Sequence, residues 1–433
     1  MENQTTIFDM LYPKKKITKP IRLIELFGGY GSQALALKYL GVKFEYWKLV
    51  EWAVKSIQAY KDIHFSNDDV DYSDFIDRDT LISILYGLGI STNYNEPMKY
   101  EQIVRLNENQ LRNIYNIIMA TNNLVNIQQV HGEDLEIVDT EKYEYIMTYS
   151  FPCQDLSLAG KGKGMSDTST RSGMLWEVER ILTECENKPQ ILLMENVPQV
   201  HSDDNLEDFN KWKYRLEELG YKNYFQDLIA TDYGIPQTRN RTFMISILGD
   251  YNYTFPKPIP LKLKLKDMLE DNVDEKYYLS DRQIKDIQSW NAYQKPLENM
   301  EQIDKINISP TLTTRTGAYA AGMILIKNAN SKGYLEATDG DGVDISSRME
   351  YHRGTVQKGK TQTLTTMGGE NNGVVLNDLR IRKLTPRECF RLMGVKDEDF
   401  DKVAKNQSDS SLYHLAGDSI VVNVLMAIFK ELL

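Results

Sequence analysis

The stretch from Ile21 to Glu51 constrains the fold of this chain more than any other. In order, it has the patterns of a buried strand, a glycine turn, a helix, a second strand and an acidic residue: Ile21–Phe27, Gly28–Ser32, Gln33–Leu40, Phe44–Val50 and Glu51. This succession is typical of the opening of a doubly wound sheet that binds a nucleotide. We therefore predict an α/β fold.

The glycine turn leaves two kinds of ligand open. Gly29-Tyr-Gly31-Ser-Gln-Ala34 fits the dinucleotide fingerprint, and Glu51 follows Gly31 by about 20 residues, as that fingerprint requires. The same geometry serves any adenosine ligand, because the acid binds ribose hydroxyls and the glycines let the ligand approach the backbone. A dehydrogenase and an enzyme with another adenosine cofactor are both compatible with this stretch alone.

Strand and helix patterns continue to alternate up to about residue 250: Tyr143–Tyr149, Gly173–Leu182, Gln190–Met194, Leu206–Leu219 and Thr242–Leu248. This alternation indicates a mostly parallel sheet covered by helices. From Phe255 onward the composition changes, with several prolines and an alternation of lysine and leucine, so we place a domain boundary near residue 251. We predict one domain from 20–250 with 408–433, carrying an insertion at 65–128, and a smaller, mainly β domain at 251–407. The last helix is expected at Ile420–Leu432, behind a cap at Asp418-Ser419.

The composition excludes several classes of protein. The chain is 41% hydrophobic and 26% charged, and no apolar run approaches the roughly 18 residues of a membrane span. Its N-terminus lacks the apolar core of a signal peptide, so we expect a cytoplasmic protein. The cysteines Cys153, Cys185 and Cys389 lie far apart, and no cysteine and histidine have the spacing of zinc ligands. We expect neither a disulfide framework nor a metal.

The net charge of −11 would disfavour a nucleic-acid partner, since phosphate contacts use lysine and arginine. The segment Tyr351–Thr366, however, holds Arg353, Lys358 and Lys360 without an acidic residue. A local basic face of this kind on an acidic protein is compatible with DNA, and also with a solvated loop.

A cysteine stands where a predicted strand meets a long polar loop. Cys153 follows the strand Tyr143–Tyr149, and Pro152 restricts the backbone just before it. The position suits a nucleophile, although a lone cysteine is more often a buried structural thiol. Two further sites adjoin predicted strands, Glu195-Asn-Val197 and Gln237-Thr-Arg239-Asn-Arg241. Each could hold a solvated acid or surface salt bridges, but together at one sheet edge they would place a thiol, a carboxylate and two guanidinium groups beside the cofactor turn.

Taken in order, these motifs resemble those of a DNA cytosine-5 methyltransferase of the bacterial or phage restriction–modification type. The resemblance runs from about Arg22 to Phe429, except for 65–128 and most of 255–360. The segments that carry it are Glu25–Gly31, Glu51-Trp52, Asp134-Leu135, Phe151–Gln154, Glu195–Val197, Gln237–Arg241, Arg382–Gly394 and Ala416–Val422. The resemblance implies a doubly wound, Rossmann-like domain that depends on S-adenosylmethionine, and a smaller target-recognition domain.

The resemblance also implies a role for each site residue. The catalytic residues would be Cys153, Glu195, Arg239 and Arg241. The residues that bind S-adenosylmethionine would be Phe27, Gly29, Tyr30, Gly31, Ser32, Glu51, Trp52, Asp134, Leu135, Pro152, Leu175, Asp418 and Ser419. The residues that contact DNA would be Ser157, Gln237, Arg353, Lys358, Lys360, Thr363 and Leu364.

The chemistry explains why such residues are needed. Cytosine C5 is too weak a nucleophile to take a methyl group directly, and a Cys153 thiolate that adds at C6 would concentrate electron density on C5. Glu195 would share a proton with N3, Arg239 would hold O2 or the thiolate side, and Arg241 would steady Glu195. The target base must be flipped out of the duplex, so we expect Leu158–Arg171 to form the lid over it. The product would be S-adenosylhomocysteine, and no metal would take part.

Three positions depart from the family pattern. Glu25 stands where aspartate is usual, and Ser32 replaces a frequent glycine. Asp418 stands where asparagine is usual, beside the expected carboxylate of the cofactor. It would repel that carboxylate unless it turned to the cofactor's ammonium, and we expect it to serve as a helix cap.

Other functions are compatible with some of the same motifs. A tRNA cytosine-5 methyltransferase would share the core, but the large variable region argues against it. A catalytically silent DNA-binding relative is disfavoured because Cys153, Glu195, Arg239 and Arg241 are all present. A dehydrogenase is disfavoured because it would give these residues no role. We expect a monomer that acts on double-stranded DNA, with a separately acting restriction endonuclease as a potential partner.

Overall fold

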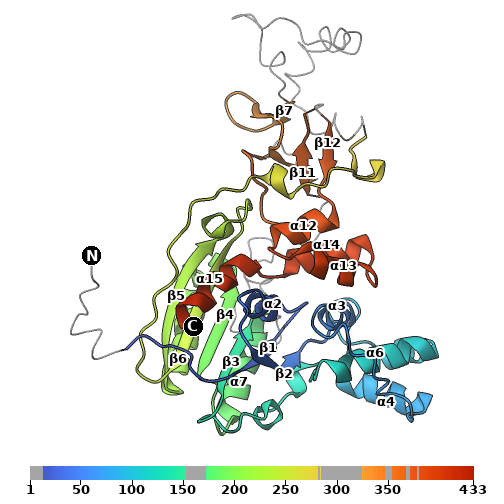
Figure 1. Ribbon diagram of the computed structural model, residues 1–433, viewed down its shortest axis with the longest axis vertical. Coiled ribbons are helices and arrows are strands. Elements are labelled where there is room, and N and C mark those ends of the chain that lie inside the picture. The colour runs from blue at the N-terminus through green and yellow to red at the C-terminus, as the bar shows by residue number, and fades with distance from the viewer. Residues whose placement is uncertain are drawn as a thin grey trace, which may run out of the picture.

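A six-stranded mixed sheet organises the large domain (Figure 1). The computed structural model describes residues 13–152, 172–280, 283, 324–346, 354–366, 371–377 and 380–433. In sheet order, the strands are β2 (Phe44–Val50), β1 (Ile21–Leu26), β3 (Glu144–Tyr149), β4 (Ile191–Asn196), β6 (Asn240–Leu248) and β5 (Tyr221–Ile229). β2, β1, β3 and β4 pair in parallel, whereas β6 runs antiparallel to both of its neighbours. The predicted α/β sheet is therefore confirmed, with its last two strands in a hairpin.

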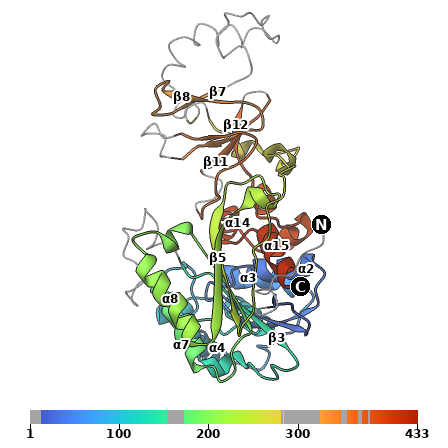
Figure 2. The same cartoon turned by 90° about the vertical axis from the view of Figure 1, so that its left-hand side faces the viewer.

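Helices cover both faces of this sheet, because alternate side chains of each strand point to opposite sides. One face packs on α2 (Ser32–Tyr39), α3 (Val54–His64), α12 (Pro386–Leu392), α13 (Asp397–Ala404), α14 (Asp409–Asp418) and α15 (Val422–Leu432). The other face packs on α7 (Leu175–Glu184) and α8 (Leu206–Glu218). Figure 2 shows α7 and α8 on one side of the sheet, with α2 and α15 on the other. The three layers are those of a doubly wound fold.

The insertion at 65–128 forms a helical lobe beside the edge strand β2 (Figure 1). Its helices are α4 (Arg78–Leu88), α5 (Tyr100–Val104) and α6 (Glu108–Ala120), and they pack around a core of their own that includes Ile57 of α3. The chain returns twice to the segment just after β2. The backbone N–H of Ser91 donates to the carbonyl of Trp52, and the side chain of Asn123 bonds both the N–H and the carbonyl of Glu51. The insertion thus fixes the segment that carries two predicted cofactor residues.

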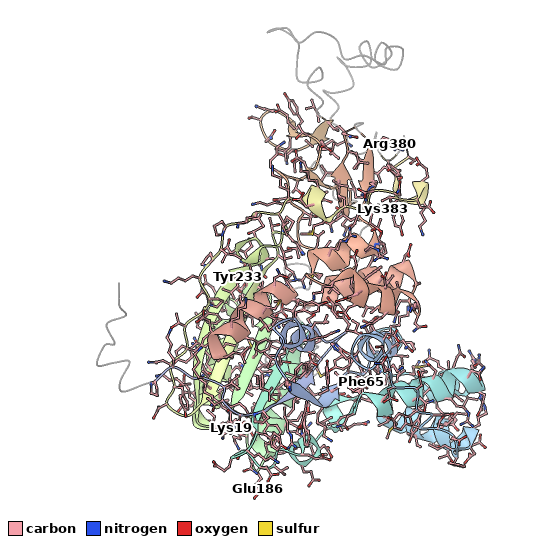
Figure 3. The ribbon with its side chains drawn as sticks, viewed as in Figure 1. Lys19, Phe65, Glu186, Tyr233, Arg380 and Lys383 are labelled. Atoms are coloured by element: carbon pink, nitrogen blue, oxygen red, sulfur yellow. The ribbon has the colours of Figure 1, made fainter. Side chains whose placement is uncertain are left out.

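The smaller domain is built on short strands above the large domain (Figure 2). A four-stranded sheet has the order β10 (Val356–Gln357), β9 (Gly342–Asp344), β11 (Asn372–Val375) and β12 (Ile381–Lys383), and β7 (Ile324–Lys327) pairs with β8 (Tyr334–Ala337). These strands share a small apolar cluster. Figure 3 shows Arg380 and Lys383 on this domain, and Arg380 lies 3.3 Å from Glu275 in an ion pair.

The helices after β12 belong with the large domain. Phe390 of α12 and Phe400 of α13 lie in the same apolar cluster as the sheet and α2, and α13 packs on α3. A bidentate pair between Arg382 of β12 and Glu388 of α12, at 2.8 and 2.7 Å, ties the two domains together. The domain boundary that we now propose therefore lies near residue 385 and not at 407.

The segment Asp409–Leu432 is the one stretch among the described residues that is apolar and long enough to cross a membrane, and 72% of its most apolar window is buried inside the protein. It consists of α14 and α15, which are core helices of the large domain. The cap of α15 is Val421, with no side-chain hydrogen bond, and Asp418 is the last residue of α14. The expectation that Asp418 caps the final helix was wrong, because the chain bends between Ser419 and Val421 before the helix begins.

Candidate active site

The predicted site residues meet at one edge of the large sheet. The glycine turn follows β1, Glu51 follows β2, Pro152 follows β3, and Glu195 lies at the end of β4. Arg241 lies at the start of β6, where a parallel strand would have placed it at the opposite edge. Because β6 is antiparallel to β4, with Glu195 paired to Phe243, the start of β6 lies beside the end of β4. The carboxyl edge of such a sheet is where ligands bind.

The glycine turn between β1 and α2 is packed closely on α3. Gly31 has φ +82°, and a Cβ there would lie 2.4 Å from Nε2 of His64. Gly29 has φ +56°, and its N–H donates to Oε2 of Glu51 at 3.0 Å. Only glycine adopts such backbone angles without strain, so the sequence of the turn follows from its conformation.

Glu51 connects the glycine turn to the segment just after β2, which the insertion contacts. Its other oxygen accepts from the N–H of Ala53 at 2.8 Å. Burial raises the pKa of Glu51 to about 7, and the carboxylate of Asp418 acts in the same direction. Trp52 beside it is half-buried, as are Phe27 and Asp134. An acceptor with neighbouring aromatic side chains at a sheet edge fits a ribose and an adenine ring.

Glu25 does not reach the cofactor edge. Its side chain is completely buried, and its two oxygens accept from the Tyr60 hydroxyl at 2.5 Å and the Ala34 N–H at 3.3 Å. Burial raises the pKa of this carboxyl to about 7. Glu25 therefore supports the start of α2 from beneath the turn.

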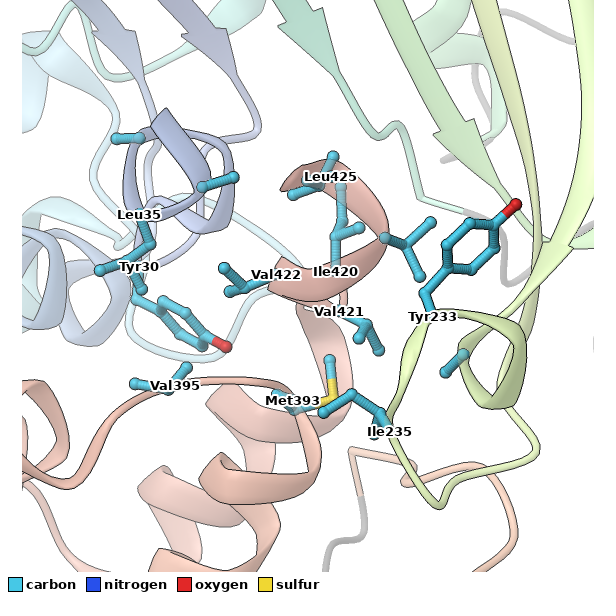
Figure 4. Packing of buried hydrophobic residues seen from close by; sticks show 14 of the residues in the cluster. Tyr30, Leu35, Tyr233, Ile235, Met393, Val395, Ile420, Val421, Val422 and Leu425 are labelled. Carbon is cyan, nitrogen blue, oxygen red and sulfur yellow. The ribbon is translucent and has the colours of Figure 1, made fainter. Parts of the chain in front are cut away.

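Several residues that we predicted to bind the cofactor have buried side chains. The side chains of Tyr30, Leu135 and Leu175 have no exposed surface, and Ser32 is 3% exposed. Figure 4 shows Tyr30 pointing into the core near Val395 and Val422, and its ring stacks on Phe390 with centroids 5.3 Å apart. Tyr30, Leu135 and Leu175 pack in the apolar core, and the binding of the cofactor by these four residues stays a prediction.

Glu195 and Arg241 form a buried ion pair. The carboxylate oxygen Oε1 of Glu195 lies 3.1 Å from Nε of Arg241, and Glu195 is only 7% exposed. Burial raises the pKa of Glu195, while the two guanidinium groups of Arg241 and Arg239 oppose the rise. Burial thus favours the protonated carboxyl more than water does, which suits a group that shares a proton with a base.

Arg239 joins three chain segments. Its terminal nitrogens donate to the backbone carbonyls of Leu364 at 2.9 Å, Gly417 at 3.1 Å and Ser419 at 2.7 Å. It is 4% exposed, and burial lowers its pKa to about 9. We expected Arg239 to hold the target base or the thiolate, but its terminal nitrogens are engaged by backbone. The guanidinium beside Glu195 belongs to Arg241.

Two predicted DNA contacts are also internal. The side chain of Gln237 is completely buried: its amide donates to the carbonyl of Leu392 at 2.8 Å and accepts from the N–H of Leu364 at 3.1 Å. The side chain of Leu364 is 1% exposed and packs in the main core. Both expectations were wrong, because these residues anchor the small domain to the large one.

Three of the remaining residues that we predicted to contact DNA lie in the described part of the small domain. Lys358 pairs with Asp341 at 2.8 Å and donates to the carbonyl of Glu336, so its ammonium holds the small sheet together. Lys360 and Thr363 are half-buried. Ser157 and Arg353 lie outside the described residues.

Cys153 and the predicted lid Leu158–Arg171 also lie outside the described residues. The chain just before Cys153 is held at the site, because the amide of Asn196 donates to the carbonyl of Phe151 at 2.9 Å. Asn196 lies in the motif Glu195-Asn-Val197, so its position in the site could be predicted from the sequence. Asn123, which fixes Glu51, carried no signal, because its contact exists only once the insertion folds back on β2.

The comparisons with known proteins agree with this geometry. Residues 99–433 match the model of the C-5 cytosine-specific DNA methylase family. The chain belongs to this family. The type II methyltransferase M2.ScrFI of Lactococcus lactis subsp. cremoris is 33% identical over 425 residues, which are 95% of this chain and 99% of that one. The orphan methyltransferase M.SssI of Spiroplasma monobiae is 31% identical, over 96% of this chain and 98% of its own.

Solved structures share the fold of this C-5 cytosine-specific DNA methylase. The Entamoeba histolytica methyltransferase EhMeth aligns with a TM-score of 0.56 and 13% identity, over 96% of this chain and 98% of its own. The S. pombe Dnmt2 methyltransferase aligns with a TM-score of 0.52 and 15% identity, over 95% and 98%. The protein is thus a DNA (cytosine-5-)-methyltransferase of the kind found in restriction–modification systems.

Proposed function

We propose that this methylase transfers the methyl group of S-adenosylmethionine to C5 of a flipped-out cytosine in a specific double-stranded DNA sequence. The reaction passes through a covalent bond between Cys153 and C6 of the base. The observation that carries the proposal is the buried Glu195–Arg241 pair, which lies at the same sheet edge as the glycine turn and Glu51. A proton-sharing acid beside an adenosine site is what the reaction requires.

The residues after β1 and β2 fit S-adenosylmethionine. Glu51 would accept hydrogen bonds from the ribose hydroxyls, and the half-buried rings of Phe27 and Trp52 would pack on the adenine. Asp134, held by the N–H of His131, would face the edge of the adenine. When bound, the cofactor supplies an electrophilic methyl group.

The residues after β3 and β4 would act on the cytosine. The Cys153 thiolate forms a bond to C6, and the electron pair displaced from the ring moves towards N3, where Glu195 shares its proton. The resulting enamine is nucleophilic at C5. Arg241 keeps the Glu195 carboxyl in place and offers the cationic donor for O2, the part that we first gave to Arg239. Loss of the C5 proton and then of the thiolate restores the aromatic ring.

The small domain, at about 251–385, would recognise the target sequence, with Arg353, Lys360 and Thr363 contacting bases or backbone and Ser157 contacting a phosphate. The hydroxyl groups of Thr363 and Ser157 and the positive charges of Lys360 and Arg353 suit a DNA backbone. We further propose a cytoplasmic monomer that releases S-adenosylhomocysteine and works alongside a separate endonuclease. No residue of this scheme requires a metal.

Transfer of labelled methyl groups tests the proposal. Wild-type protein should label duplex DNA and leave a tRNA pool unlabelled, and bisulfite sequencing of DNA from expressing cells should show cytosines that resist conversion within one short sequence. Cys153→Ala should abolish transfer but retain DNA binding. Label in tRNA alone, or robust turnover by Cys153→Ala, would overturn the proposal.

A further inference from the structure

The loop Ser91–Pro97 of the insertion reaches the cofactor edge of the large domain. It is tied to the segment after β2, because Ser91 exchanges backbone hydrogen bonds with Trp52 and Val54. Within the loop, the side chain of Asn93 accepts from the N–H groups of Asn95 and Glu96. The tip of the loop is therefore fixed relative to Glu51.

Tyr94 at this tip is held in an unfavourable backbone conformation. Its φ is +63°, in the left-handed region that a bulky residue adopts only when its surroundings require it. Its ring stacks on His414 of α14, with centroids 3.9 Å apart and 33° between the planes. The hydroxyl oxygen of Tyr94 is buried.

The Tyr94 hydroxyl is buried without a hydrogen-bond partner of normal geometry, although the hydroxyls of Ser56 and Ser411 lie near it. Burial raises its pKa, and the carboxylates of Glu51 and Asp418 act in the same direction. A buried hydroxyl that lacks a partner is unfavourable by itself, so a native structure that keeps one calls for an explanation. Strain, burial and the missing partner all coincide at the edge where Glu51 and Asp418 lie.

We propose that Tyr94 binds the cofactor, donating a hydrogen bond from its hydroxyl to the carboxylate of S-adenosylmethionine. This inference rests on the proposed function. Glu51 and Asp418 offer carboxylate oxygens, which suit the ribose hydroxyls and the ammonium of that cofactor. Its carboxylate can only accept, and next to two acids it needs a donor. Tyr94 is an uncharged donor at this edge, and it comes from the insertion.

The test uses the full-length protein, Tyr94→Phe and a matched control, Tyr86→Phe. Tyr86 stands on α4 of the same insertion and is 51% exposed. Titration calorimetry would measure the Kd of S-adenosylmethionine, of S-adenosylhomocysteine and of decarboxylated S-adenosylmethionine. We expect Tyr94→Phe to weaken the first two roughly tenfold or more, the usual effect of one hydrogen bond to a charged group, and to leave the third unchanged. Tyr86→Phe should bind all three as wild type does.

Melting of the ligand-free proteins separates this role from a structural one. Removing an unpartnered hydroxyl should leave the melting temperature of Tyr94→Phe equal to that of wild type or higher, whereas a structural hydroxyl would lower it. Unchanged affinity for the two carboxylated ligands, or an equal loss for the decarboxylated one, would overturn the inference. If the wild type bound none of the three, the proposed function itself would fail, and this distinguishes the two failures.

Discussion

The buried carboxyl of Glu25 makes the stability of the large domain depend on pH. Its pKa rises from 4.5 to about 7 on folding, chiefly through burial. The folded protein therefore holds this proton more tightly than the unfolded chain does. The stabilisation is complete below pH 4.5, and it is lost as the pH rises through about 7. A change of this size corresponds to about 3 kcal/mol, since one pH unit is worth about 1.4 kcal/mol.

Glu25→Gln removes the titrating group and keeps an amide that can bond Tyr60 and Ala34, the two partners of the carboxyl. Urea unfolding of both proteins at about pH 5 and about pH 8 would give the free energy of unfolding. Between these conditions we expect the variant to gain about 2.5 kcal/mol relative to wild type, because pH 5 already lies above the pKa of the unfolded chain. Glu398→Gln, at a side chain that is 70% exposed, controls for the loss of one acidic residue. A difference between Glu25→Gln and wild type that stayed constant with pH would refute the reasoning.

Two further substitutions test the site. Arg239→Ala should lower the free energy of unfolding by about 3 kcal/mol or more, because three buried carbonyls lose a charged donor. A loss below about 1 kcal/mol in urea unfolding would contradict the structural role of Arg239, which is to join three chain segments. Glu195→Gln should reduce methyl transfer by about 100-fold or more while cofactor affinity stays the same, since only the proton shared with the base is lost. Rates and calorimetry on one preparation would check this, and near-normal turnover would remove Glu195 from the mechanism.

The elements that the sequence predicted best are those whose signals are local. The strand patterns at 21–27, 44–50 and 190–194 correspond to β1, β2 and β4, because apolar runs that end at glycine or an acid depend little on distant residues. The turn at Gly29 and Gly31 was predictable for the same reason: its backbone angles require glycine.

The features that sequence missed depend on tertiary contacts. Strand direction is not encoded in period-2 alternation, so the antiparallel course of β6 could not be inferred from Thr242–Leu248. Arg239 and Arg241 are two residues apart and chemically identical. Only their surroundings in the fold show that Arg239 binds backbone carbonyls and that Arg241 pairs with Glu195. The insertion looked inert for the same reason, since Asn123 meets Glu51 only in the folded chain.

The covalent bond to Cys153 is the most direct test of the proposed reaction. Wild-type protein would be incubated with S-adenosylmethionine and duplex DNA that carries 5-fluorocytosine in the target sequence, where C5 cannot lose a proton after methylation. We expect a complex that survives denaturation and whose peptide, by mass spectrometry, carries the modified base on Cys153. A duplex that is methylated in its unsubstituted form yet gives no adduct, or an adduct on another residue, would contradict the mechanism.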